Sequence, residues 1–251
     1  DINQDKVPVI FFSGSHNHYP DNFFNRGGLD ILIALRYLHG QGIKFRTIIK
    51  SALPPEIKNA FVELGNSGAD ITLIEKPVSD EEMTSLHAQS DIYLLPAAGI
   101  HAHSTMRGLS SGNTCILSDA PQFKDFIEEN NQALMVEGQN ARIYTRDPKS
   151  GWLVDSYSEI REPNITQIKH LTRLLHACLT QPELRQRISE NAWTNFGPDQ
   201  RTDSVQNGVN KLIAKIQPSS PSGPSSLVNF RNIIRSQKRS SSSTVIAGQA
   251  I

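Results

Sequence analysis

Residues 92–119 constrain the fold of this 251-residue chain more than any other segment. The segment begins with the apolar run Ile-Tyr-Leu-Leu-Pro and continues through a turn of small residues that carries His101 and His103. A short helical stretch then stops at Gly112, and a second apolar run follows around Cys115. In a Rossmann-like sheet, a strand, a turn and a helix in this order present the helix N-terminus to an anionic ligand. We therefore place the candidate site at this turn.

Strand-like and helix-like segments alternate along the first 136 residues. Apolar runs predict strands at 7–13, 45–49, 71–74, 92–95, 115–117 and 133–136. Helical spacing predicts helices at 29–40, 54–64, 79–89 and 121–127 and in the stretch before Gly112. Gly40 is expected to end the first helix, and Ser79 with Glu82 forms a capping box. Strands separated by helices imply right-handed crossovers, so we expect an α/β fold with a doubly wound, mostly parallel sheet and helices on both faces.

The last 115 or so residues follow a different pattern. Residues 137–163 are polar and predict an excursion on the surface or over the site. Helices are expected again at 165–180, 182–196 and 204–216. Residues 217–251 are basic and rich in serine and proline, a composition that rarely supports a packed core. We therefore expect a folded domain at 1–216 and a disordered tail at 217–251.

Composition limits the partners. The 25 basic side chains balance the 25 acidic ones, which argues against binding to nucleic acid or to an anionic membrane surface. No apolar run approaches the roughly 18 residues that a membrane span requires. Cys115 and Cys178 both lie in apolar surroundings, which favours reduced core thiols and a cytoplasmic location. Because the chain begins with Asp1, we expect it to be a fragment or a processed piece.

Topology brings two histidine-bearing turns together. In a doubly wound sheet the strand order reverses between the first and fourth strands, and ligands lie at their carboxyl ends. Residues 14–18 then face residues 99–104, and four histidines meet: His16, His18, His101 and His103. These side chains could be solvated, could contact a ligand or, least favoured because no carboxylate cluster accompanies them, could bind a metal.

Several residues near these turns are suited to a phosphate group. Backbone amides at 102–105 lie at a helix start, although Ser104 could equally be a structural cap. Arg26, just before Gly27, offers a permanently charged donor, with a surface arginine as the alternative. Lys50 and Ser51 lie at the same sheet edge and could also form a solvated loop.

Four segments in this order carry a family resemblance. They are Asn-Arg-Gly-Gly-Leu-Asp at 25–30, Val-Ser-Asp-Glu-Glu-Met at 78–83, Gln-Ser-Asp-Ile-Tyr-Leu-Leu-Pro at 89–96, and Leu-Ser-Ser-Gly at 109–112 leading into Ile-Leu-Ser-Asp at 116–119. Together they resemble the C-terminal, nucleotide-sugar-binding half of group 1 retaining glycosyltransferases, which have the GT-B fold. The resemblance covers roughly residues 7–135.

The resemblance implies that this domain binds a nucleotide-sugar donor and needs no metal or other cofactor. Arg26, where the family more often has lysine, would hold the diphosphate, and the amides at 103–105 would hold phosphate. The turns at 50–51 and 76–78 would border the nucleobase. The residues expected to contact the donor are Gly14, Ser15, His16, Arg26, Gly27, Lys50, Ser51, Pro77, Gly99, His101, His103, Ser104, Thr105 and Arg107.

The chain also departs from the family pattern. Family members carry two glutamates eight residues apart around this turn, and Gly99 and Arg107 occupy those positions. The N-terminal, acceptor-binding half of the fold is missing from the chain as well. We therefore expect the donor-binding half of a glycosyltransferase with an unknown acceptor, inactive alone. The alternatives are a degenerate binding or interaction domain and, less favoured, a metal-dependent hydrolase that uses the four histidines.

Overall fold

The structure is a computed structural model of the chain. It describes residues 6–14, 20–97, 101–119, 123, 127–137, 144–146, 148–151, 153–155 and 161–198. All of these residues fall within Asp1–Asn207, the first of the two units into which the chain divides. The expected helix at 204–216, the expected tail and most of the expected helix at 121–127 lie outside the described residues.

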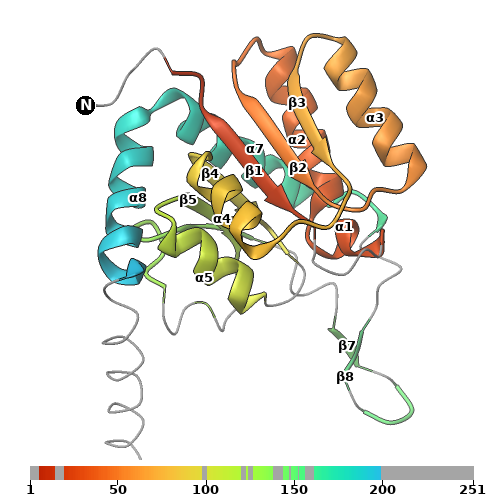
Figure 1. Ribbon diagram of the computed structural model, residues 1–251. Helices are drawn as coiled ribbons and strands as arrows, with labels where there is room; N and C mark the ends of the chain where they lie inside the picture. The colour runs from red at the N-terminus through yellow and green to blue at the C-terminus, as the bar shows by residue number, and fades with distance from the viewer. Residues whose placement is uncertain are drawn as a thin grey trace, which may run out of the picture. The chain divides into compact units, whose positions relative to one another are not determined.

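Six parallel strands form the central sheet in the order β3-β2-β1-β4-β5-β6 (Figure 1). The strands are β1 (Val9–Ser13), β2 (Arg46–Lys50), β3 (Asp70–Ile74), β4 (Ile92–Leu95), β5 (Thr114–Ser118) and β6 (Leu134–Val136). This is the doubly wound order expected from the sequence, and the order reverses between β1 and β4. Phe11 of β1 pairs with Tyr93 of β4 at that point.

Helices cover both faces of the sheet. They are α1 (Asp21–Asn25), α2 (Gly28–Gly40), α3 (Pro55–Asn66), α4 (Asp80–Ala88), α5 (Ala102–Ser110), α7 (Ile165–Thr180) and α8 (Pro182–Phe196). Alternate side chains of β1 pack on opposite faces of the sheet, because successive side chains of a strand point in opposite directions. Ile10 and Phe12 pack in the core under α2, α3 and α7, whereas Phe11 packs in the core under α4 and α5.

Among the described residues, the structure confirms the order of the expected strands and helices and corrects the end of α2. The capping box is present, with the Glu82 amide donating to Ser79 Oγ at 3.1 Å and the Ser79 amide donating to Glu82 Oε2 at 2.7 Å. Gly40 is still helical, however, and Gly42 (φ +75°) adopts the left-handed conformation after α2. Cys115 and Cys178 are buried and free, as expected.

Three elements were not expected from the sequence. The short helix α1 lies between the expected strand at 7–13 and the expected helix at 29–40, where no element was expected. Within the polar stretch, β7 (Tyr144–Arg146) and β8 (Leu153–Asp155) form an antiparallel pair. Strands of three residues carry too little alternation for a sequence pattern to show them. Across the part of the chain that the structure describes, no helix is long and apolar enough to cross a membrane.

Candidate functional site

A cavity of about 510 Å³ opens at the carboxyl ends of β1 and β4, where the strand order reverses. Its walls come from the end of β1, from Arg26 after α1, from α4, from β4 and from the first two turns of α5. Ligands of open α/β sheets bind at this position, because neighbouring crossovers leave the sheet on opposite faces and open a crevice. The fold therefore puts the cavity where the sequence placed the site.

Arg26 is the central charged group of the cavity. Only 8% of this residue is exposed, yet three polar groups accept from its guanidinium. Nη1 donates to the Ser13 carbonyl at 3.1 Å and to Ser104 Oγ at 3.2 Å, and Nη2 lies 3.3 Å from His101 Nδ1. Burial lowers the pKa of Arg26, but a guanidinium stays protonated in proteins. Since Nε has no partner among the described residues, this fixed cation keeps a free donor.

His101 is neutral and joins Arg26 to the start of α5. Burial, and then the charge of Arg26, lowers the pKa of His101 to about 4. Because Arg26 can only donate, His101 Nδ1 is the acceptor, and its proton is therefore assigned to Nε2. His101 also occupies the N-cap position of α5 without a capping hydrogen bond from its side chain.

Ser104 does not cap α5, which corrects the structural alternative considered for it. It lies inside the first turn, and its Oγ accepts from Arg26 instead. The first intrahelical bond runs from the Thr105 amide to the His101 carbonyl at 2.9 Å. The amides of residues 102–104 therefore have no acceptor within the helix, and the helix dipole adds partial positive charge at the same end. Because the first turn carries no acidic residue, this end of the cavity suits an anion.

At the opposite wall of the cavity, an ion pair links α4 to α5. Arg107 Nη2 and Asp80 Oδ1 form an ion pair at 2.9 Å, with 19% of the Arg107 side chain exposed and 77% of that of Asp80. The resemblance led us to expect Arg107 in place of a glutamate, and the carboxylate that the structure places at this wall is that of Asp80 from α4.

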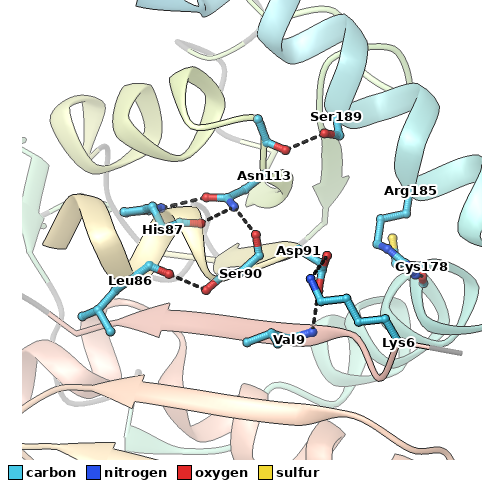
Figure 2. A network of polar contacts seen from close by, with 11 residues as sticks. Lys6, Val9, Leu86, His87, Ser90, Asp91, Asn113, Cys178, Arg185 and Ser189 are labelled. Carbon is cyan, nitrogen blue, oxygen red and sulfur yellow. Dashed lines mark hydrogen bonds and ion pairs between the residues drawn. The ribbon is translucent and has the colours of Figure 1, made fainter. Parts of the chain in front are cut away.

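His87 of α4 also lines the cavity, and the network in Figure 2 holds its side chain in place. Asn113 Nδ2 donates to the carbonyls of His87 and Ser90 at 2.9 and 2.6 Å, so its Oδ1 is the acceptor for His87 Nδ1 at 2.8 Å. Burial lowers the pKa of His87 to about 4; the charge of Arg107 adds to this effect, and the bond to Asn113 opposes it. His87 is therefore neutral with its proton on Nδ1, and Nε2 is the ring nitrogen left for the cavity that His87 lines.

The structure brings part of the expected residue set together. Arg26, His101, His103, Ser104 and Arg107 line the cavity. The expected residues Ser15, His16 and Gly99, together with His18, lie outside the described residues. Gly14, Gly27, Lys50, Ser51, Pro77 and Thr105 are described and are not among the lining residues.

Two of the expected glycines have packing reasons. A Cβ at Gly14 would lie 1.9 Å from Ser51 Oγ, so the close approach of the β1 and β2 ends requires glycine there. Gly14 is not among the described residues with a positive φ, so the close approach of Ser51, and not an unusual backbone conformation, accounts for this glycine. Gly27 does have φ +78°, and its Cβ would lie 2.5 Å from the Pro96 carbonyl. Lys50 is buried, and burial followed by the charge of Arg26 lowers its pKa.

Five lining residues were missed by the reasoning from sequence: Ser13, Asp80, Met83, His87 and Tyr93. Tyr93 lies in the apolar run of a buried strand, and His87 lies in a mostly polar helical segment, so neither position gave a sequence signal for the site. Among the described histidines, cysteines and carboxylates, no group of three or more is placed to hold a metal ion. His101 and His103 line one cavity, and their convergence with His16 and His18 stays a prediction.

No family model matches the sequence, and no curated protein matches it. The fold, in contrast, is similar to solved structures. One is the C-terminal domain of a group 1 family glycosyl transferase from Francisella tularensis (TM-score 0.53, 15% identity, 75% of this chain and 85% of that one). Another is a glycosyltransferase from Rickettsia africae (TM-score 0.53, 15% identity, 83% of this chain and 48% of that one).

A third similar structure is Anabaena HepE in complex with UDP and glucose (TM-score 0.54, 11% identity, 84% of this chain and 49% of that one). The chain thus spans about half the length of the Rickettsia and Anabaena proteins. The chain therefore has the fold of the C-terminal domain of group 1 glycosyltransferases, the Rossmann-like half of the GT-B fold that its sequence predicted.

Proposed function

We propose that this chain is the donor-binding half of a glycosyltransferase that moves a hexosyl group from a nucleotide-activated sugar to an acceptor. One observation carries the proposal: the buried Arg26 guanidinium and the N-terminus of α5 meet in a cavity at the β1–β4 switch point. Permanent positive charge and unpaired amides in one place suit a diphosphate. The HepE structure with UDP and glucose supports a nucleotide-sugar as the ligand.

In this proposal, the residues of the chain act on the leaving group. As the sugar–phosphate bond breaks, negative charge grows on the departing diphosphate. Arg26 and the amides of α5 stabilise that charge, and because they are already fixed, little reorganisation is needed. The acceptor would bind to a second domain, so the chain alone is not expected to transfer a sugar.

A second candidate is a binding or interaction domain that has lost catalysis. It is favoured by Arg107, whose ion pair with Asp80 occupies the wall of the cavity where the family pattern has a glutamate. Either candidate can bind a nucleotide in this cavity. Only the glycosyltransferase half should transfer a sugar once an acceptor-binding domain is supplied.

Calorimetry with a panel of nucleoside diphosphates tests the proposed site. Arg26→Ala should weaken binding of the best ligand by about 1–3 kcal/mol, because charge-assisted contacts to phosphate are lost. Arg26→Lys should lose less, since it keeps the charge and forfeits only the forked geometry. The control is Arg36→Ala, which removes an exposed arginine of α2 and should leave affinity unchanged.

Thermal unfolding without ligand shows separately whether each variant is folded. Folded Arg26 variants that bind as tightly as the wild type would remove Arg26 from the site. If the wild type binds none of the nucleotides, the proposed function is wrong.

A further inference from the structure

We propose that the Tyr93 hydroxyl is an additional ligand-binding group of this cavity, a neutral donor to a phosphate oxygen. This inference rests on the proposed function, because it takes the ligand to be a phosphate ester. It concerns a residue that lines the cavity, carries a polar atom and is assigned to the core by sequence patterns.

Packing fixes the Tyr93 side chain. The residue is fully buried in β4, between Phe11 of β1 and Cys115 of β5. Its ring centroid lies 4.7 Å from that of His87 and 5.7 Å from that of Phe11. A Cβ at Gly108 of α5 would lie only 2.6 Å from Tyr93 Cδ1, so the helix backbone closes a further side. The ring has little freedom to turn its hydroxyl elsewhere.

The hydroxyl lacks a partner although it is buried. Among the described residues no group meets the geometry of a hydrogen bond with it, and Ser104, whose side chain comes near enough to lower the pKa of Tyr93, is already bonded to Arg26. A buried polar group left without a partner costs about 1–3 kcal/mol, and native proteins contain few of them. Arg26 and Ser104 lie near enough to influence the pKa of Tyr93, and both line the cavity. Tyr93 is thus one of the residues around the cavity, and a molecule bound there is the partner that we infer for its hydroxyl.

The surroundings select an anionic acceptor. Burial raises the pKa of Tyr93 to about 12, with smaller opposing effects from Arg26 and Ser104, so the hydroxyl keeps its proton at neutral pH. A donor that stands beside a guanidinium and a helix N-terminus meets positive charge on both sides. A phosphate oxygen satisfies all three groups together, whereas a cationic ligand would be repelled by two of them.

Tyr93→Phe tests this inference because it deletes one oxygen atom and keeps the ring. With UDP as the probe in calorimetry, we expect affinity to fall by on the order of tenfold to a hundredfold, the range for a hydrogen bond to a charged group. Tyr37→Phe is the matched control, since Tyr37 is exposed on α2 and its hydroxyl should not affect UDP binding. Without ligand, Tyr93→Phe should unfold at the same temperature as the wild type or higher, because an unpartnered buried hydroxyl has been removed.

Two results would overturn the inference and leave the proposed function standing. One is unchanged UDP affinity in Tyr93→Phe while Arg26→Ala binds more weakly. The other is a melting temperature several degrees lower in Tyr93→Phe without ligand, which would show that the hydroxyl already has a partner in the free protein. If UDP and the other nucleoside diphosphates fail to bind the wild type, the proposed function and this inference fail together.

Discussion

At the scale of residues, the cavity is lined by the buried cation Arg26 and by two neutral histidines, His87 and His101. Arg26 is held by acceptors from β1 and α5, and His101 and His87 are each fixed in one tautomer by their partners. Arg26, His101 and Ser104 were predictable, because each lies beside a glycine-rich or small-residue turn at the sheet edge. Tyr93 and His87 were not, because a polar atom on a buried ring gives no periodic signal. Their roles depend on tertiary contacts.

The depressed pKa of His87 predicts acid sensitivity. The unfolded chain binds a proton at His87 below about pH 6.5, while the folded protein binds it only near pH 4. The free energy of unfolding should therefore be highest above pH 6.5 and fall by about 3 kcal/mol from this group as the pH drops to 4. Denaturant unfolding at several pH values measures this slope of the free energy of unfolding against pH.

His87→Gln should flatten that slope, because glutamine can still bond to Asn113 and carries no titrating proton. His101 adds a loss of the same sign in the same window. His176→Gln, at an exposed position of α7, serves as the control. An unchanged slope in His87→Gln would show that His87 is not the group that titrates.

At the scale of elements, close packing of α5 on β4 and β5 positions the start of α5 at the cavity. Gly108 makes this approach possible, because a Cβ there would lie 2.6 Å from Tyr93 Cδ1 and 3.0 Å from Cys115 Sγ. The helices and strands of the sheet were predictable to within a residue or two, because their apolar runs are long. The pair β7–β8 and helix α1 were not, since three to five residues carry too few turns or alternations.

Gly108→Ala should destabilise the protein by about 1–3 kcal/mol, since the added methyl group overpacks Tyr93. It should also weaken nucleotide binding, because α5 has to move away from Arg26. Gly65→Ala is the matched control: nothing lies within 4 Å of that Cβ position in α3, and alanine favours a helix by about 1 kcal/mol. Chemical denaturation measures the stability of the two variants. Equal stability of the two variants would contradict the packing argument.

At the scale of the whole molecule, topology determines where the cavity lies. The alternation of strands and helices predicts the sheet, the sheet order predicts the β1–β4 crevice, and the cavity is found there. What topology does not specify is which side chains meet inside it. The pairing of Arg107 with Asp80 depends on how α4 and α5 pack, and no pattern in either helix shows it.

The proposed function requires a diphosphate to bind between Arg26 and the N-terminus of α5. The most direct test is an NMR titration of the ¹⁵N-labelled chain with UDP, followed at assigned backbone amides. We predict the largest shifts at Ala102, His103 and Ser104, whose amides have no acceptor within the helix. The proposed diphosphate site would be contradicted if these three amide signals did not shift and the shifted signals came instead from another cavity, such as the groove between α2 and α7 beside Tyr37.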